Sequence, residues 1–252
     1  MWDFVGNKVN AGLPNLLCFP FAGGSPLTFR LWPPALEMNI FVANRPESET
    51  SNCTLTDIAA SQLNSLQAAN FSFENQYFTF GHSLGALNSY EFAVEIQRRG
   101  LPPPACSFFS GMSAPHVADG EIFTPPEEDS DEGFLSLLKK FRGTPESVLN
   151  DPDMMSYLLP GIKSDFKLLW GYKLRHRIRL QNPICVYFSE SDSLIPCDSM
   201  GEWEFYSDDC AFRKFFGDHF YLQSNAADFL IDLRHQITSG IANAQGEALP
   251  EN

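Results

Sequence analysis

The feature that most constrains the fold is the pentapeptide GHSLG at residues 81–85, which fits the pattern G-x-S-x-G. A short β-rich run at residues 76–80 precedes it, and a strong helical pattern at residues 84–99 follows it. A strand that turns sharply into a helix at a serine is the nucleophile elbow of α/β-hydrolases, and flanking glycines are expected because the turn is tight. The motif predicts an α/β-hydrolase with Ser83 as nucleophile. The alternative is a glycine-flanked serine that only caps a helix.

The rest of the chain alternates β-rich and helical patterns, which predicts a mostly parallel sheet flanked by helices. Strands are expected at residues 15–20, 39–44, 76–80, 105–111, 183–189 and 211–216, and helices at residues 55–69, 84–99 and 221–237. The 252 residues, 44% of them hydrophobic, suit one α/β-hydrolase domain over residues 1–252. The last dozen residues are small and polar, so we expect them to be disordered.

The strand pattern is interrupted between about residues 116 and 180. An acidic stretch at residues 119–132 contains two adjacent prolines and is typical of an exposed loop. Three helical patterns follow near residues 131–141, 145–150 and 152–177. This segment is predicted to be a helical lid insertion between two core strands.

A serine nucleophile needs a base, and His219 is the histidine best placed for that role. It follows the predicted strand 211–216, at the carboxyl edge of the sheet where Ser83 is also expected. The other four histidines lie in the elbow, in the insertion or deep in the last predicted helix. Asp192 follows strand 183–189 by a short turn and can orient the histidine, in the chain order Ser, Asp, His of this fold. Asp198 and Asp218 are the competing acids.

The start of the helix after Ser83 also has a chemical use. The backbone N–H of Leu84 can face a developing oxyanion, aided by the helix dipole. The motifs also bear on metals and cofactors, because the sequence has no metal-spaced His/Cys/Asp cluster, no P-loop and no dinucleotide fingerprint. We therefore expect no metal and no cofactor.

The net charge, the hydropathy and the cysteine pattern bear on the binding partners and the cellular location of the protein. A net charge of −14 argues against binding to nucleic acid or an anionic membrane. No apolar run approaches the ~18 residues needed to span a bilayer, and the first residues lack the pattern of a signal peptide. The six cysteines include no C-x-x-C pair and fit a reducing compartment, so the expected location is the cytoplasm.

Short motifs along nearly the whole chain resemble type II thioesterases, the stand-alone editing enzymes of polyketide and nonribosomal peptide synthesis. The opening LCFPFAGGS at residues 17–25 carries the first part of the resemblance. The other matching pieces, in chain order, are Phe29-Arg30, Trp32, residues 81–86, residues 91–93, Ser110-Gly111, Ala114-Pro115, residues 164–166, Asp192, Trp203 and residues 217–222.

The resemblance implies hydrolysis of acyl groups from the phosphopantetheine arm of an acyl or peptidyl carrier protein. It also implies that the Phe21-Ala22 turn supplies a second oxyanion N–H, which we assign to Ala22, with Phe21 as the alternative donor. The same Ser-His-Asp set would serve a carboxylesterase or an acyltransferase/cyclase, because fold does not fix the acceptor or the leaving group. A catalytically idle binding module is the alternative outside the enzymes. The sequence does not indicate an oligomeric state.

Two further groups of residues each have two interpretations. Apolar residues of the insertion recur at helical spacing, and they form either the core of the insertion or the wall of an acyl channel. The predicted substrate-binding residues are Phe21, Leu168 and Trp170. Four basic residues between positions 173 and 179 are either a solvated helix end or a docking patch for an acidic carrier protein: Lys173, Arg175, Arg177 and Arg179.

Overall fold

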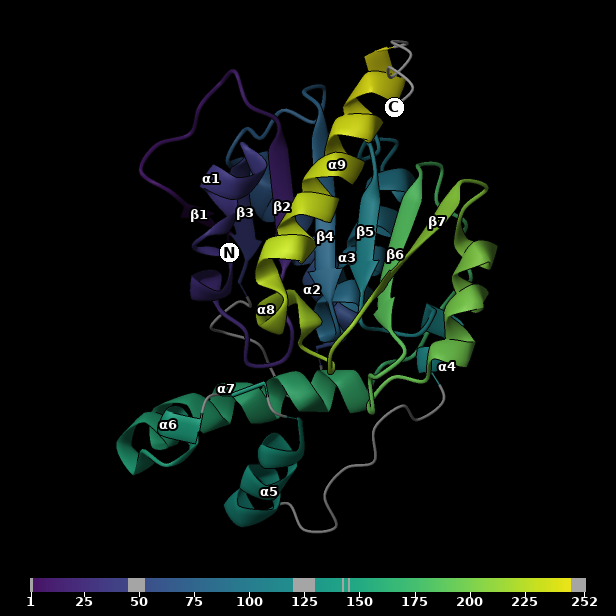
Figure 1. Cartoon of the computed structure of the whole chain (residues 1–252). Coiled ribbons are helices and arrows are strands. Elements are labelled where there is room, and N and C mark those ends of the chain that lie inside the picture. The colour runs from purple at the N-terminus through teal and green to yellow at the C-terminus, as the bar shows by residue number, and fades with distance from the viewer. Residues whose placement is uncertain (1, 45–52, 120–129, 142, 145, 246–252) are drawn as a thin grey trace.

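A seven-stranded sheet forms the centre of the computed structural model, which describes residues 2–44, 53–119, 130–141, 143, 144 and 146–245 (Figure 1). The strand order is β1-β3-β2-β4-β5-β6-β7, and only the β1–β3 pair is antiparallel. The strands are β1 (Trp2–Val5), β2 (Asn15–Phe19), β3 (Asn39–Ala43), β4 (Tyr77–His82), β5 (Ser107–Ser110), β6 (Ile184–Ser189) and β7 (Cys210–Phe215).

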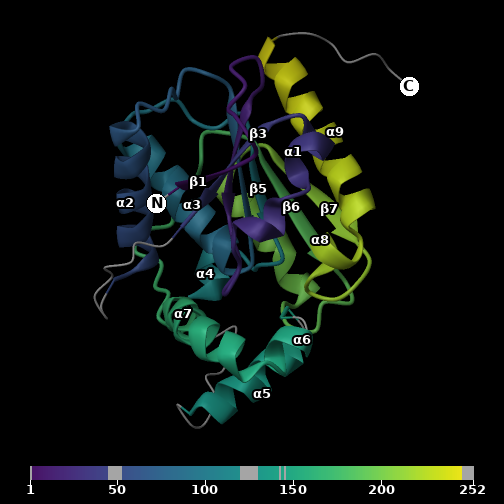
Figure 2. The same ribbon diagram turned by 90° about the vertical axis from the view of Figure 1, so that its left-hand side faces the viewer.

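Helices cover both faces of the sheet, as the view turned by 90° shows (Figure 2). On one face lie α2 (Leu55–Ala68) and α3 (Leu84–Arg98), and on the other lie α1 (Trp32–Leu36), α8 (Tyr221–Ser224) and α9 (Ala226–Gln245). The remaining helical elements are η1 (Pro26–Phe29), α4 (Pro115–Ala118), α5 (Asp131–Phe141), α6 (Glu146–Leu149), α7 (Pro152–Trp170) and η2 (Cys197–Tyr206).

The side chains of β2 show why both faces must be covered. Leu16 and Cys18 join the core beneath α1 and α9, whereas Leu17 and Phe19 join the core beneath α2 and α3. All four are fully buried. A strand buried on both faces is a continuous apolar run rather than an alternating one, as expected for a parallel sheet between helices.

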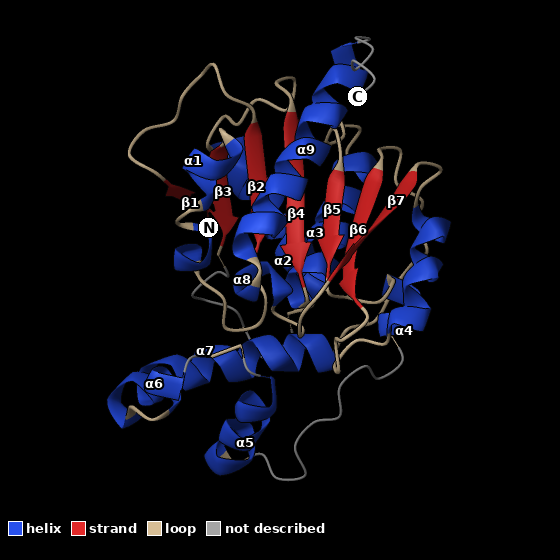
Figure 3. Cartoon of the chain, in the orientation of Figure 1, coloured by secondary structure: helices blue, strands red, loops and turns tan. Residues whose placement is uncertain are grey.

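Helices α5, α6 and α7 lie together beyond the ends of the strands, outside the two helical layers (Figures 1 and 3). The arrowheads of β4 and β6 point toward α7, so this segment lies at the carboxyl edge of the sheet. Its aromatic residues pack on one another: Phe166 contacts the rings of Phe134, Phe141 and Trp170. The segment therefore stands over the edge at which parallel α/β sheets bind ligands.

The predicted α/β-hydrolase fold is confirmed, and the six predicted strands are present with ends that match or differ by at most two residues. Strand β1 was not predicted. The helix expected at 152–177 ends at Trp170, and the one expected at 221–237 is divided at Asn225 and continues to Gln245, into the tail expected to be disordered. Most of the predicted acidic loop and the last seven residues lie outside the described part of the chain. No described helix is long and apolar enough to cross a membrane.

The basic run from Lys173 to Arg179 follows α7 as an irregular segment and is not helical, so the expected helix end is wrong. Its charges have partners within the chain. Lys173 pairs with Asp119, with an N–O distance of 3.1 Å, and Arg179 pairs with Asp208. The guanidinium carbon of Arg177 lies 5.4 Å from the ring centroid of Phe205. These contacts hold the segment against the body of the molecule.

A buried carboxylate connects α2, α3 and the chain that follows α7. Glu91 of α3 accepts hydrogen bonds from the hydroxyls of Tyr172 (2.8 Å) and Thr56 (3.0 Å). Burial raises the pKa of Glu91, and the two hydrogen bonds oppose that rise in part. The chain leaving α7 is thereby fixed to α2 and α3.

Candidate active site

Ser83 stands between the last residue of β4 and the first residue of α3, with a left-handed φ of 55°. Such a φ is costly for any residue with a side chain. The backbone holds it in place: the Ser83 N–H donates to the Ser110 carbonyl (2.8 Å), and the Ser83 carbonyl accepts from the Ala86 N–H (2.9 Å). The strained turn predicted from the G-x-S-x-G motif is present, with the serine 6% exposed.

The two glycines of the motif are required by close backbone approaches. A Cβ on Gly85 would lie 1.9 Å from the carbonyl oxygen of Phe19, at the end of β2. A Cβ on Gly81 would lie 2.1 Å from the carbonyl oxygen of Gly85. Both distances are far below any tolerated contact, so only glycine lets α3 begin this close to β2 and β4.

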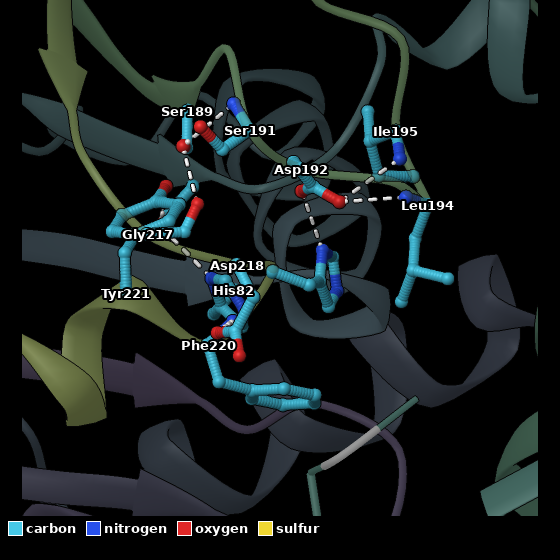
Figure 4. A network of polar contacts seen from close by, with 12 residues as sticks. His82, Ser189, Ser191, Asp192, Leu194, Ile195, Gly217, Asp218, Phe220 and Tyr221 are labelled. Carbon is cyan, nitrogen blue, oxygen red and sulfur yellow. Dashed lines mark hydrogen bonds and ion pairs between the residues drawn. The ribbon is translucent and has the colours of Figure 1, made fainter. Parts of the chain in front are cut away.

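His219 and Asp192 meet at the same edge, although they are 27 residues apart in the chain. The His219 Nδ1 lies 2.7 Å from the Asp192 Oδ2, and their side chains are 3% and 2% exposed. The other carboxylate oxygen, Oδ1, accepts the backbone N–H groups of Leu194 (2.8 Å) and Ile195 (3.1 Å) (Figure 4). The carboxylate is thus fixed on both sides, and one oxygen faces the imidazole.

The competing acids lie elsewhere. Asp198 is exposed at the start of η2. The carboxylate of Asp218 is exposed and accepts the backbone N–H of Phe220 (3.0 Å), so it caps its own loop. Asp192 is the one of the three predicted acids that hydrogen-bonds His219.

The loops that carry Asp192 and His219 are joined by a contact that sequence reasoning missed. The Ser189 hydroxyl donates to the Gly217 carbonyl (2.6 Å) and accepts from the Ser191 N–H (3.1 Å) (Figure 4). Ser189 ends β6, and Gly217 lies two residues before His219. Nothing in the residue pattern of the sequence indicated this contact.

A second missed contact lies behind the imidazole of His219. The fully buried ring of His82 lies 4.9 Å from the ring of His219, centroid to centroid. His82 Nδ1 is 2.9 Å from the Ser110 hydroxyl, which is 2.6 Å from the Tyr221 hydroxyl. Burial lowers the pKa of His82 well below its usual value, with the neighbouring His219 as the second cause. His82 is therefore a neutral ring that supports His219.

The predicted oxyanion donors lie on either side of Ser83. As the first residue of α3, Leu84 has no helical carbonyl for its N–H. Ala22 lines the same small cavity as Ser83 and His219, and its N–H meets no acceptor among the described residues. Phe21 is mostly buried and packs edge-on against Phe220, with centroids 5.0 Å apart.

Two cavities meet at Phe21, which lines both of them. The smaller one, about 30 Å³, contains Ser83 and His219 and is closed by residues of the α5–α7 segment, including Leu138 and Phe166. The larger one, about 310 Å³, lies between α2, α3 and α7 and is lined by Leu168. Trp170 lines neither of them and packs on Phe134 and Phe166 instead.

Comparison with known proteins assigns the family. The family model described as a thioesterase domain matches residues 14–238. The chain belongs to the thioesterase domain family. The chain is 30% identical over 242 residues to the gramicidin S biosynthesis protein GrsT of Aneurinibacillus migulanus, with 91% of each chain covered. The thioesterase PikA5 of Streptomyces venezuelae is 26% identical over 240 residues, covering 91% of this chain and 84% of PikA5.

The solved structures give the same result. RedJ, a thioesterase from the prodiginine biosynthetic pathway of Streptomyces coelicolor, superposes with a TM-score of 0.78 at 25% identity, covering 91% of this chain and 90% of RedJ. The resemblance to type II thioesterases and the prediction of a thioester hydrolase are thereby confirmed.

Proposed function

We propose that this thioesterase hydrolyses acyl groups from the phosphopantetheine arm of an acyl or peptidyl carrier protein in polyketide or nonribosomal peptide synthesis. Ser83 is the nucleophile, His219 the general base and Asp192 the residue that orients His219. The observation that carries these roles is the buried 2.7 Å contact between Asp192 and His219 beside a cavity shared by His219 and Ser83. The carrier-bound substrate is supported by the pathways named for GrsT and RedJ.

The chemistry follows from where the protons can go. Asp192 accepts a hydrogen bond from the Nδ1–H of His219, which leaves Nε2 without a proton and free to take the proton of the Ser83 hydroxyl. Ser83 attacks the thioester carbonyl, and the oxyanion is bound by the N–H groups of Leu84 and Ala22. His219 then protonates the leaving thiol, and the acyl group stays on Ser83 as an ester. Water, activated by His219, releases the free acid.

The deciding experiment compares the wild-type protein with Ser83→Ala on a carrier-bound acyl thioester and a matched oxygen ester, with products followed by mass spectrometry. We expect free acid from the thioester much faster than from the ester, and a loss of at least about 10³-fold in the variant with an unchanged melting temperature. Full activity in the variant would exclude Ser83 as nucleophile. Preference for the oxygen ester, or a cyclised or transferred product, would instead favour the esterase or acyltransferase alternative.

A further inference from the structure

The larger cavity has an unusual wall for a site expected to hold an acyl chain. It is bounded by the loop after β2, by α2 and α3, and by α7. At about 310 Å³ it is roughly the size of a small-molecule site, whereas the cavity around Ser83 is a tenth of that. Phe21 lines both cavities, and Leu84 next to Ser83 lines the larger one, so the larger cavity is the space beside the reacting groups that is big enough for a longer acyl group.

Hydrogen-bond acceptors line this cavity. Gln62 of α2 is 1% exposed, and its Oε1 has no hydrogen-bond partner among the described residues. Asn88 of α3 also lines the cavity, and its Oδ1 is buried and equally unpartnered. The carboxylate of Asp165, which accepts the Gly23 N–H at 2.8 Å, contributes to the same wall. A buried acceptor without a donor is costly, so each such oxygen indicates a missing N–H or O–H group.

The spacing of residues along α3 gives the distance between the reacting carbonyl and a hydrogen-bond donor bound by Asn88. Leu84, whose N–H faces the oxyanion in the proposed mechanism, and Asn88 are four residues apart, so they lie on one face of the helix about 6 Å apart. An extended chain covers about 6 Å in roughly five bonds. A donor about five atoms along the acyl chain would therefore reach Asn88.

We propose that Gln62 and Asn88 are specificity-determining residues that favour acyl groups carrying an N–H donor, such as peptidyl groups, over plain alkanoyl groups. This inference rests on the proposed function, because it concerns the acyl half of the same thioester. The amides of the phosphopantetheine arm offer the same N–H chemistry, so the experiment must separate the arm from the acyl group.

The test uses three acyl groups on one carrier protein. The 4-acetamidobutanoyl group has an N–H at the fifth chain position, the 6-oxoheptanoyl group has CH₂ there and is otherwise matched, and the acetyl group is too short to reach the cavity. The wild-type protein should have a kcat/KM about tenfold higher for the acetamido substrate than for its oxo analogue, as one hydrogen bond can supply. Asn88→Leu and Gln62→Met should each reduce that preference severalfold and leave acetyl hydrolysis unchanged.

Ile58→Val is the matched control, because it alters the same wall without removing an acceptor. It should change the two longer substrates equally. Asn88→Leu is the decisive variant if Gln62→Met lowers the melting temperature, since Asn88 is only partly buried. Equal kcat/KM for the acetamido and oxo substrates in the wild-type protein would overturn the inference, as would variants that slow all three substrates alike, which would assign the acceptors to the arm. Absence of free acid from all three substrates with the wild-type protein would instead contradict the proposed function itself.

Discussion

Replacement of Asp192 by asparagine tests the proposed mechanism at its most constrained point. The Oδ1 of Asp192 accepts two backbone N–H groups, from Leu194 and Ile195, and its Oδ2 faces His219 Nδ1. In Asp192→Asn the amide oxygen must take the Oδ1 position, because an NH₂ group there would oppose two donors. The NH₂ group is then forced toward His219.

That orientation reverses the tautomer of the imidazole. An asparagine NH₂ donates to Nδ1, so the ring proton moves to Nε2, and Nε2 can no longer accept the proton of Ser83. The corresponding substitution in a serine protease lowers kcat about 10⁴-fold for this reason. Four powers of ten correspond to about 5 kcal/mol of transition-state stabilisation, which is the loss we expect here.

The assay is kcat/KM for release of free acid from a carrier-bound acyl thioester, with the melting temperature as a check on folding. Asp198→Asn and Asp218→Asn are matched controls, since both carboxylates are exposed and hydrogen-bond no histidine. They should retain activity within a few-fold of wild type. A folded Asp192→Asn protein with more than a tenth of wild-type activity, or an equal loss in either control, would refute the reasoning.

Four other substitutions probe the packing around the site. Gly85→Ala places a Cβ 1.9 Å from the Phe19 carbonyl oxygen; we expect a loss of about 3 kcal/mol or more and a Tm about 10 °C lower by calorimetry, and an unchanged Tm would contradict the close approach. Burial raises the pKa of Glu91 in the folded protein above its unfolded value. The folded wild-type protein therefore binds more protons than the unfolded chain, and it loses stability as the pH rises from about 4.5 through the folded-state pKa. Denaturant titrations should show that the free energy of unfolding of Glu91→Gln rises relative to that of the wild type between pH 4 and pH 8. An equal difference in the free energy of unfolding at both pH values would exclude this linkage. Leu168→Ala should change the preferred acyl length, because Leu168 lines the larger cavity, whereas Trp170→Ala should lower Tm without that change; a shifted preference in the tryptophan variant alone would reverse this assignment.

The sequence predicted the sheet well because its buried strands are short, apolar and separated by clear helical patterns. It also predicted that His219 and Asp192 each follow the carboxyl end of a strand, and hence share an edge with Ser83. The end of α7 could not be predicted in this way. Tyr172 continues the helical pattern, but its hydroxyl donates to Glu91, 81 residues earlier. That contact fixes the chain in a non-helical course after α7, and no local sequence pattern predicts it.

The contacts around the histidine were missed for a related reason. His82 sits in the elbow motif and its ring packs on His219, 137 residues later, while the Ser189 hydroxyl joins two loops 28 residues apart. Side-chain directions at the end of a strand decide both contacts, and a pattern of residue types does not contain them. The cavity lined by Gln62 and Asn88 could not be predicted from the sequence either, because it depends on how α2 and α3 face each other.

The α5–α7 segment is attached to both sides of the site at once. On one side, the Gly23 N–H in the loop that carries Ala22 donates to Asp165 of α7 (2.8 Å). On the other, Gly143 lies so close to Phe220 that a Cβ there would be 2.2 Å from the ring. Phe220 follows His219 directly. A displacement of the segment therefore has to break a hydrogen bond at the predicted oxyanion loop or uncover the residue next to the predicted base. The wall of the acyl cavity and the geometry of the reacting groups are thus coupled through the same segment. Substitutions in the cavity must therefore be compared with acetyl hydrolysis before they are interpreted as changes in specificity.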